Sequence, residues 1–114
     1  MRKPGAIGAL AALSGAVAVT AGAFGAHGAS GRAAEWLTTG AHYQMVHAVA
    51  ALLALGWQRG RGAAWLFILG SALFAGTLYA MAMGAPRWFG AVTPLGGAAM
   101  IGGWLLLALA ALRR

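Results

Sequence analysis

Three histidines and a small set of hydroxyl, amide and charged side chains carry most of the chemistry that this 114-residue sequence offers. Imidazole can bind a metal, transfer a proton, or donate and accept hydrogen bonds near neutral pH. The sequence has no cysteine, so thiol chemistry and disulfides are excluded. The candidate polar or ligand site consists of His27, His42, Tyr43, Gln44, His47, Ser14, Ser71, Tyr79, Glu35 and Arg87.

Helical spacing sorts the residues between 42 and 47. Tyr43 and Gln44 lie four and three residues before His47, so the three side chains share one face of a helix. His42 lies five residues before His47 and points elsewhere, which disfavours the i,i+4 histidine pair of many metal sites. A metal would need His27, Glu35 and a further histidine to converge across helices. We expect no cofactor and no bound metal.

The sequence disfavours an enzyme. It has no aspartate and one glutamate, Glu35, so no Ser-His-Asp set can form. We expect Glu35 to pair with Arg32 or Arg87, or to cap a short helix, rather than to act as a base. The glycines follow no predicted strand and therefore do not indicate nucleotide binding.

Four long apolar blocks must position these side chains. The chain is 61% hydrophobic and 8% charged, and each block is near the roughly 20 residues that cross a bilayer as a helix. We predict an all-α integral membrane four-helix bundle with glycine-rich helix packing, in a single domain, 1–114. The predicted helices are 5–26, 38–57, 63–84 and 93–112, with the longest connection at 27–37.

The first block also has features of a signal peptide, with Arg2 and Lys3 before an apolar stretch. Gly8, Gly15 and Gly22 recur every seven residues, however, and a heptad stripe of small residues is typical of a surface that packs on another helix. We therefore interpret block 5–26 as a retained helix.

The basic residues predict how the chain is threaded. Cytoplasmic segments of membrane proteins are enriched in Lys and Arg, so both termini are expected in the cytoplasm of a bacterial inner-membrane, multi-pass protein. The sequence has no continuous run of Lys and Arg, so we do not expect it to bind nucleic acid. The expected surroundings are the lipid bilayer. One side would carry Arg2, Lys3, Arg59, Arg61, Arg113 and Arg114, and the other Arg32 and Arg87.

Counting along the blocks places Ser14, His47 and Ser71 near the bilayer midplane. Polar side chains at that depth are expected to face the bundle interior with a partner. Two interpretations are open. Either His47 forms hydrogen bonds to Ser14 or Ser71 that hold helices together, or it belongs to a ligand or proton site. Trp104 is also expected near mid-membrane and needs a packing or hydrogen-bonding partner.

Ordered motifs along the chain resemble one family. They are GAFGAH (22–27), WLTTGAHYQMVHAVA (36–50), LFAGTLYAMAMGAPRWFGAVTPLGG (73–97) and GGW (102–104). The sequence is similar to the domain-of-unknown-function 423 family, which comprises YgdD-type inner-membrane proteins and the related transmembrane protein 256. The resemblance implies a small four-helix membrane protein and supplies no reaction. The family pattern often has an acid just before Tyr-Gln, where this chain has His42.

These observations favour a non-enzymatic membrane protein, either an accessory or assembly component or a homo-oligomer, that contacts other membrane subunits or copies of itself. The alternative is binding or transport of a small molecule, an ion or protons through a polar site around His47, open to the outer face.

Overall fold

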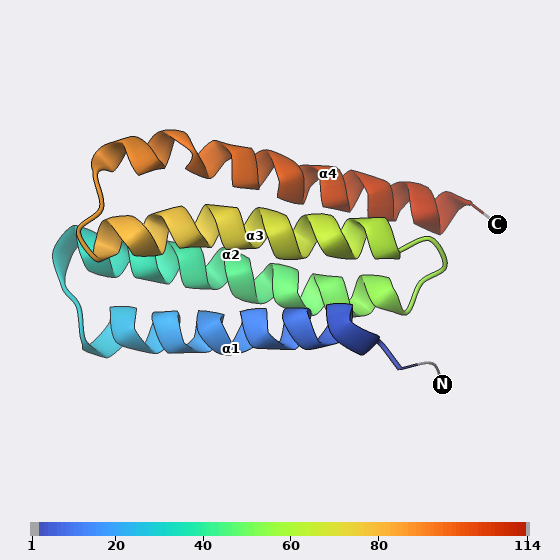
Figure 1. Cartoon of the computed structure of the whole chain (residues 1–114), viewed down its shortest axis with the longest axis horizontal. Helices are drawn as coiled ribbons and strands as arrows, with labels where there is room; N and C mark the ends of the chain where they lie inside the picture. The colour runs from blue at the N-terminus through green and yellow to red at the C-terminus, as the bar shows by residue number, and fades with distance from the viewer. Residues whose placement is uncertain (1–2, 114) are drawn as a thin grey trace.

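The computed structural model describes residues 3–113, which form four α-helices and one short 3-10 helix. They are α1 (Gly5–His27), α2 (Gly31–Leu55), α3 (Arg61–Ala82), η1 (Arg87–Ala91) and α4 (Thr93–Leu112). Consecutive helices run antiparallel, so both ends of the chain lie at one end of the molecule, the terminal end (Figure 1). The 28–30 turn and η1 lie at the opposite end.

The helices pack mainly on their neighbours in the chain. α1 packs on α2, α2 on α3 and α3 on α4, with a smaller contact between α1 and α3. The molecule measures 48 × 27 × 18 Å, and α1 and α4 form its two long edges (Figure 1). The predicted all-helical fold is therefore present, in a flat arrangement that follows chain order.

The sequence prediction for the second helix is wrong at its start. α2 begins at Gly31 rather than near 38, so the long connection expected at 27–37 is reduced to residues 28–30. Ser30 is extended and Gly31 has φ +62°, a conformation that glycine adopts without steric cost. The Arg-Ala-Ala-Glu run that follows consists of good helix formers, which extends α2 beyond its apolar part.

α1 and α2 meet along the heptad stripe of small residues. A Cβ added at Gly22 would lie 3.4 Å from Ala41, one at Gly15 would lie 3.8 Å from Ala48, and one at Gly8 would lie 4.0 Å from Leu55. Each step of seven residues along α1 is matched by seven along the antiparallel α2.

α3 and α4 approach each other more closely. A Cβ at Gly96 would lie 2.5 Å from the backbone nitrogen of Phe74 and 2.6 Å from the carbonyl oxygen of Gly70. A Cβ at Gly70 would in turn lie 3.0 Å from the carbonyl oxygen of Gly96. At this crossing one backbone lies directly on the other, which only residues without a side chain permit.

The largest buried apolar cluster lies toward the terminal end. Phe67 is fully buried in this cluster, which also contains small residues of α2 and α3 and apolar residues of α1 and α4. The cluster comprises Ile7, Ala11, Ala50, Ala51, Ala54, Ala63, Ala64, Phe67, Ile68 and Leu107. The buried polar side chains lie mainly between this cluster and the opposite end.

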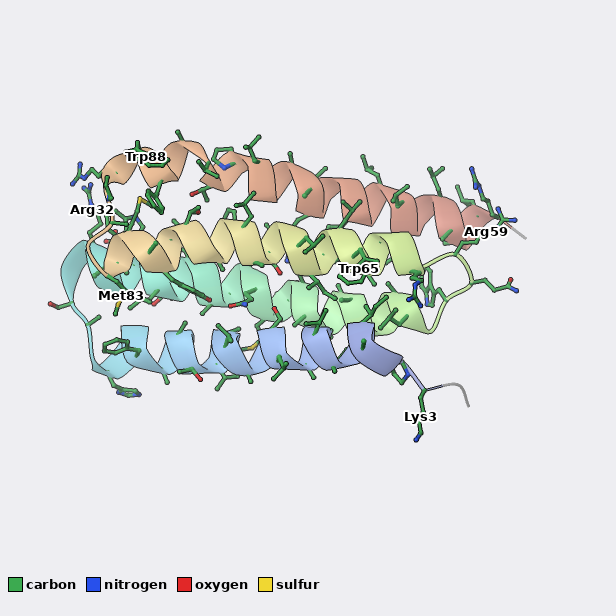
Figure 2. All side chains as sticks on the ribbon, viewed as in Figure 1. Lys3, Arg32, Arg59, Trp65, Met83 and Trp88 are labelled. Atoms are coloured by element: carbon green, nitrogen blue, oxygen red, sulfur yellow. The ribbon has the colours of Figure 1, made fainter. Side chains whose placement is uncertain are left out.

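Three segments within residues 3–113 are long and apolar enough to cross a membrane, namely Gly5–His27, Arg61–Ala82 and Arg87–Leu112. α2 does not meet the same criterion because its first half is rich in polar residues. The charged residues lie at the ends of the helices, with Lys3 and Arg59 at the terminal end and Arg32 at the opposite end (Figure 2).

Candidate functional site

Gln44 of α2 links three helices through the two ends of its amide. Its Nε2 donates to Ser14 Oγ of α1 at 3.1 Å, and its Oε1 accepts from the Tyr79 hydroxyl of α3 at 2.7 Å. Ser14 and Gln44 are buried and Tyr79 is partly buried. Three of the predicted site residues thus form one hydrogen-bonded chain across α1, α2 and α3.

His47, one turn farther along α2, uses both ring nitrogens. Its Nε2 lies 3.0 Å from Trp104 Nε1 of α4, and its Nδ1 lies 2.6 Å from the carbonyl oxygen of Tyr43. An indole N–H can only donate, so Nε2 must accept, and the ring proton must lie on Nδ1. The two bonds therefore select a single neutral tautomer of His47.

This geometry corrects the predicted partners of His47. Ser14 bonds to Gln44, and Ser71 donates to the carbonyl oxygen of Ile68 one turn earlier in its own helix. The partner of His47 in another helix is Trp104, which lies outside the predicted site. Trp104 was expected near mid-membrane with a need for a partner, and that need is the signal that the sequence offered.

Aromatic side chains surround the His47 ring. Tyr43 stacks on it with ring centroids 6.3 Å apart, and Phe67 and Trp104 lie at 5.5 and 5.8 Å. Tyr43 also packs on Phe74 of α3 at 4.8 Å. The predicted common face of Tyr43, Gln44 and His47 is therefore present, and it is turned toward the other helices.

A second polar contact joins α3 to α4 near the opposite end. Thr77 Oγ1 and Thr93 Oγ1 lie 2.6 Å apart, and Thr77 also donates toward the carbonyl oxygens of Leu73 and Phe74. Thr93 is the first residue of α4, and its hydroxyl is buried against α3. No pattern in the sequence pairs these two threonines.

The other predicted residues remain apart from these contacts. His27, His42, Glu35 and Arg87 are exposed. His42 contacts the ring of Tyr43 edge-on at 5.7 Å and faces away from His47, as its spacing predicts. Within residues 3–113, no group of three His or Glu side chains is close enough to hold a metal ion.

The polar interior is fully paired. Among the described residues, no buried side-chain nitrogen or oxygen lacks a hydrogen-bond partner. An unpaired buried polar group is unfavourable, so this pairing favours the helix rotations that bring the partners together. Each buried polar atom among the described residues thus has at least one partner within the protein.

Apolar helices long enough to cross a bilayer, charges at their ends and paired polar groups between them define a helical membrane protein. The family model "Protein of unknown function (DUF423)" matches residues 21–97. The chain belongs to this family.

Relatives with similar sequences are described as membrane proteins. The chain is 41% identical over 85 residues to the UPF0382 inner membrane protein YgdD of Escherichia coli K12, an alignment that covers 68% of this chain and 64% of that protein. It is 40% identical over 82 residues to a UPF0382 membrane protein of Haemophilus influenzae, with 68% and 66% coverage. A Staphylococcus epidermidis UPF0382 membrane protein is 40% identical over 77 residues, with 62% of each chain covered. No solved structure matches the chain.

Proposed function

We propose that this protein is a non-enzymatic accessory or assembly component of the bacterial inner membrane, crossing it four times with both termini in the cytoplasm. The observation that carries the proposal is the complete pairing of buried polar side chains among residues 3–113. Groups that would bind a substrate or transfer a proton are used instead to hold helices together.

Support for a membrane-crossing α2 comes from its position. α2 lies antiparallel between α1 and α3, both of which are apolar enough to cross a bilayer. Its most costly polar groups, Gln44 and His47, are buried and hydrogen-bonded to other helices. A helix can cross a membrane with such residues when they face the protein interior with partners.

The exposed face of α2 is the proposed contact surface for a second copy or another membrane protein. Its groove is lined by His42, Met45, Val46 and Val49. His42 lies about eleven residues into α2, well inside the part that packs on α1, where an imidazole facing lipid is unfavourable. Another helix with a hydrogen-bonding side chain at this depth would provide a better partner than acyl chains.

A ligand or proton site at His47 has less support. Both ring nitrogens are occupied, and adding a proton to Nε2 would place it directly opposite the Trp104 N–H. A metal or an anion would first have to displace Trp104.

Single cysteines test the threading, because the natural sequence has none. In intact cells, a membrane-impermeant maleimide should label Ala85→Cys in the α3–η1 connection and should fail to label Gln58→Cys in the α2–α3 turn until the cells are opened. The reverse labelling pattern would overturn the proposed orientation.

Cysteine crosslinking tests the contact surface. Under mild oxidation, Val49→Cys on the α2 groove should form a disulfide with Val49→Cys of a second copy, whereas the similarly exposed Val19→Cys on α1 should not. Native mass spectrometry in mild detergent would give the size of the assembly. A monomer with no crosslink at Val49 would contradict an oligomeric or accessory role through this face.

A further inference from the structure

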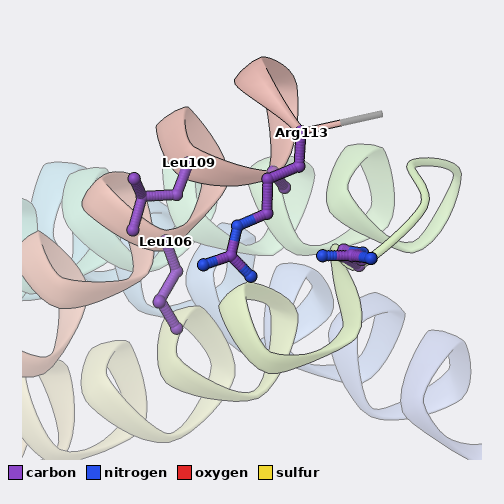
Figure 3. A pocket seen from close by; sticks show the side chains of 5 residues that line it. Leu106, Leu109 and Arg113 are labelled. Carbon is purple, nitrogen blue, oxygen red and sulfur yellow. The ribbon is translucent and has the colours of Figure 1, made fainter.

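Two arginines from different parts of the chain line one small pocket at the terminal end. Arg59 comes from the α2–α3 turn, and Arg113 directly follows α4. The remaining lining residues, Leu106, Leu109 and Ala110, come from the last turns of α4. In Figure 3 the guanidinium of Arg113 is turned back over the side of α4 that carries Leu106 and Leu109.

The chain provides no side-chain counter-ion for this pair. Its one acidic residue, Glu35, lies near the start of α2 at the opposite end of the molecule. Two guanidinium groups that line one pocket repel one another, and an anion bound between them removes that repulsion. The planar fork of arginine matches phosphate oxygens in a bidentate geometry, which makes phosphate the anion of best fit.

The backbone at Arg59 is held in an unusual conformation. Arg59 has φ +66° and is the one non-glycine residue with positive φ among residues 3–113. For a residue with a Cβ this left-handed conformation is unfavourable, and such outliers cluster at ligand-binding positions. Arg59 occupies this position although glycines flank the turn at Gly56 and Gly60.

The apolar side chains of the pocket favour a phospholipid over free phosphate as the bound anion. Leu106 and Leu109 are 42% and 49% exposed on the side of α4 next to the two arginines. A lipid whose phosphate lies between Arg59 and Arg113 would place an acyl chain along these leucines. Free phosphate would leave them uncovered.

We propose that Arg59 and Arg113, with Leu106 and Leu109, form a specific binding site for the phosphate headgroup and proximal acyl chain of an anionic phospholipid. The inference rests on the proposed function insofar as the terminal end faces the cytoplasmic leaflet, where anionic lipids attract basic residues. The proposal assigns the affinity for anionic lipid to one pocket. A general attraction to surface charge would instead depend on all basic residues at that end.

The test compares two double variants that remove equal charge from the same end. Arg59→Gln/Arg113→Gln removes the pocket cations, and Lys3→Gln/Arg61→Gln removes two cations that do not line it. Native mass spectrometry in mild detergent measures binding of dioleoylphosphatidylglycerol, with dioleoylphosphatidylcholine as the neutral comparison. We expect the pocket variant to lose roughly thirtyfold in affinity for the anionic lipid and the control variant to lose less than about threefold.

A parallel measurement separates lipid from free phosphate. Melting temperature in detergent should rise with added phosphatidylglycerol in the natural protein and in the control variant, and should respond less in the pocket variant. Inorganic phosphate alone should give no rise. Equal loss of affinity in both variants, no loss in either, or equal stabilisation by inorganic phosphate would each overturn the site.

The control variant also shows whether the fold tolerates the loss of two charges. If the pocket variant does not fold, Arg113→Gln alone replaces it, because this change leaves the α2–α3 turn intact. Lipid affinity in detergent does not depend on the direction of threading. Cysteine labelling therefore reports failure of the proposed orientation independently of failure of the lipid site.

Discussion

The two outer helices are attached to the centre of the molecule in different ways. α1 meets α2 across glycines whose added Cβ atoms would find ordinary contact distances, 3.8 Å at Gly15 and 3.4 Å at Gly22. α4 meets α3 across Gly96, where an added Cβ would lie 2.5 Å from backbone. The α1–α2 contact therefore admits a methyl group at Gly15 and Gly22, although it is tighter at Gly25, where an added Cβ would lie 3.1 Å from Leu37. The α3–α4 contact does not admit one at Gly96.

Polar contacts differ between the two sides as well. On the α1 side, Gln44 spans from Ser14 to Tyr79 and links three helices through a single side chain. On the α4 side, two separate pairs, His47–Trp104 and Thr77–Thr93, attach the helix at different depths. α1 thus has one side-chain hydrogen bond to its neighbours, at Ser14, whereas α4 combines close backbone contact with two polar pairs.

The largest effect is expected at the tight seam. Gly96→Ala should destabilise the protein by about 2 kcal/mol, because α3 and α4 must separate to admit a methyl group. Denaturant unfolding in detergent measures the change. Gly76→Ala is the matched control, since nothing lies within 4 Å of a Cβ there. Equal destabilisation by both variants would show that the α3–α4 contact is looser than described.

Gln44→Leu should have the next largest effect, about 1 kcal/mol, because two interhelical bonds of roughly 0.6 kcal/mol each are lost. A double-mutant cycle sharpens the prediction. Ser14→Ala and Tyr79→Phe should each destabilise the natural protein and should have little further effect once Gln44 is Leu. Full effects in the Gln44→Leu background would mean that the three residues do not form one chain.

At the loose seam the sign should reverse. Gly15→Ala should leave stability unchanged or raise it by up to about 0.5–1 kcal/mol, because the methyl group reaches ordinary contact with Ala48 and alanine is the better helix former. The measurement is the same unfolding experiment. A loss comparable to that of Gly96→Ala would remove the distinction between the seams.

The smallest expected effect is at the His47–Trp104 pair. Trp104→Phe should destabilise by about 0.6 kcal/mol through loss of its hydrogen bond. Nitrogen NMR of labelled histidine provides a direct test, with a protonated Nδ1 and an unprotonated, accepting Nε2 expected for His47. The opposite tautomer would contradict the assigned donor and acceptor. His47→Gln should preserve both fold and activity in a complementation assay if the role is structural.

The positions of the helices followed from sequence where local composition decides them. The length of an apolar block predicts a helix that can cross a membrane. Pro94 in the first turn marks the start of α4. The predicted start of α2 was wrong because the polar residues at 27–37 were interpreted as a loop. Residues 32–35 are nevertheless good helix formers and belong to α2. Spacing also separated His42 from His47, since the direction of a side chain around one helix is a local property.

Partners across helices were less accessible from sequence. Ser14, His47 and Ser71 were placed at similar depth, but depth along a helix axis does not give the rotation of the helix about that axis. Rotation brought Gln44 to Ser14 and Tyr79, and turned Ser71 back to its own helix. His47 and Trp104 are 57 residues apart, and no pattern in the chain joins them.

The sequence by itself determined the family, the helical membrane character and which end of the molecule carries most of the charge, because these depend on residue type, order and local period. The tertiary structure alone decided which glycines lie against backbone, which tautomer His47 holds and that Arg59 and Arg113 line one pocket. Each of those depends on how helices rotate and approach, which is set by the balance of close packing and polar pairing over the whole assembly.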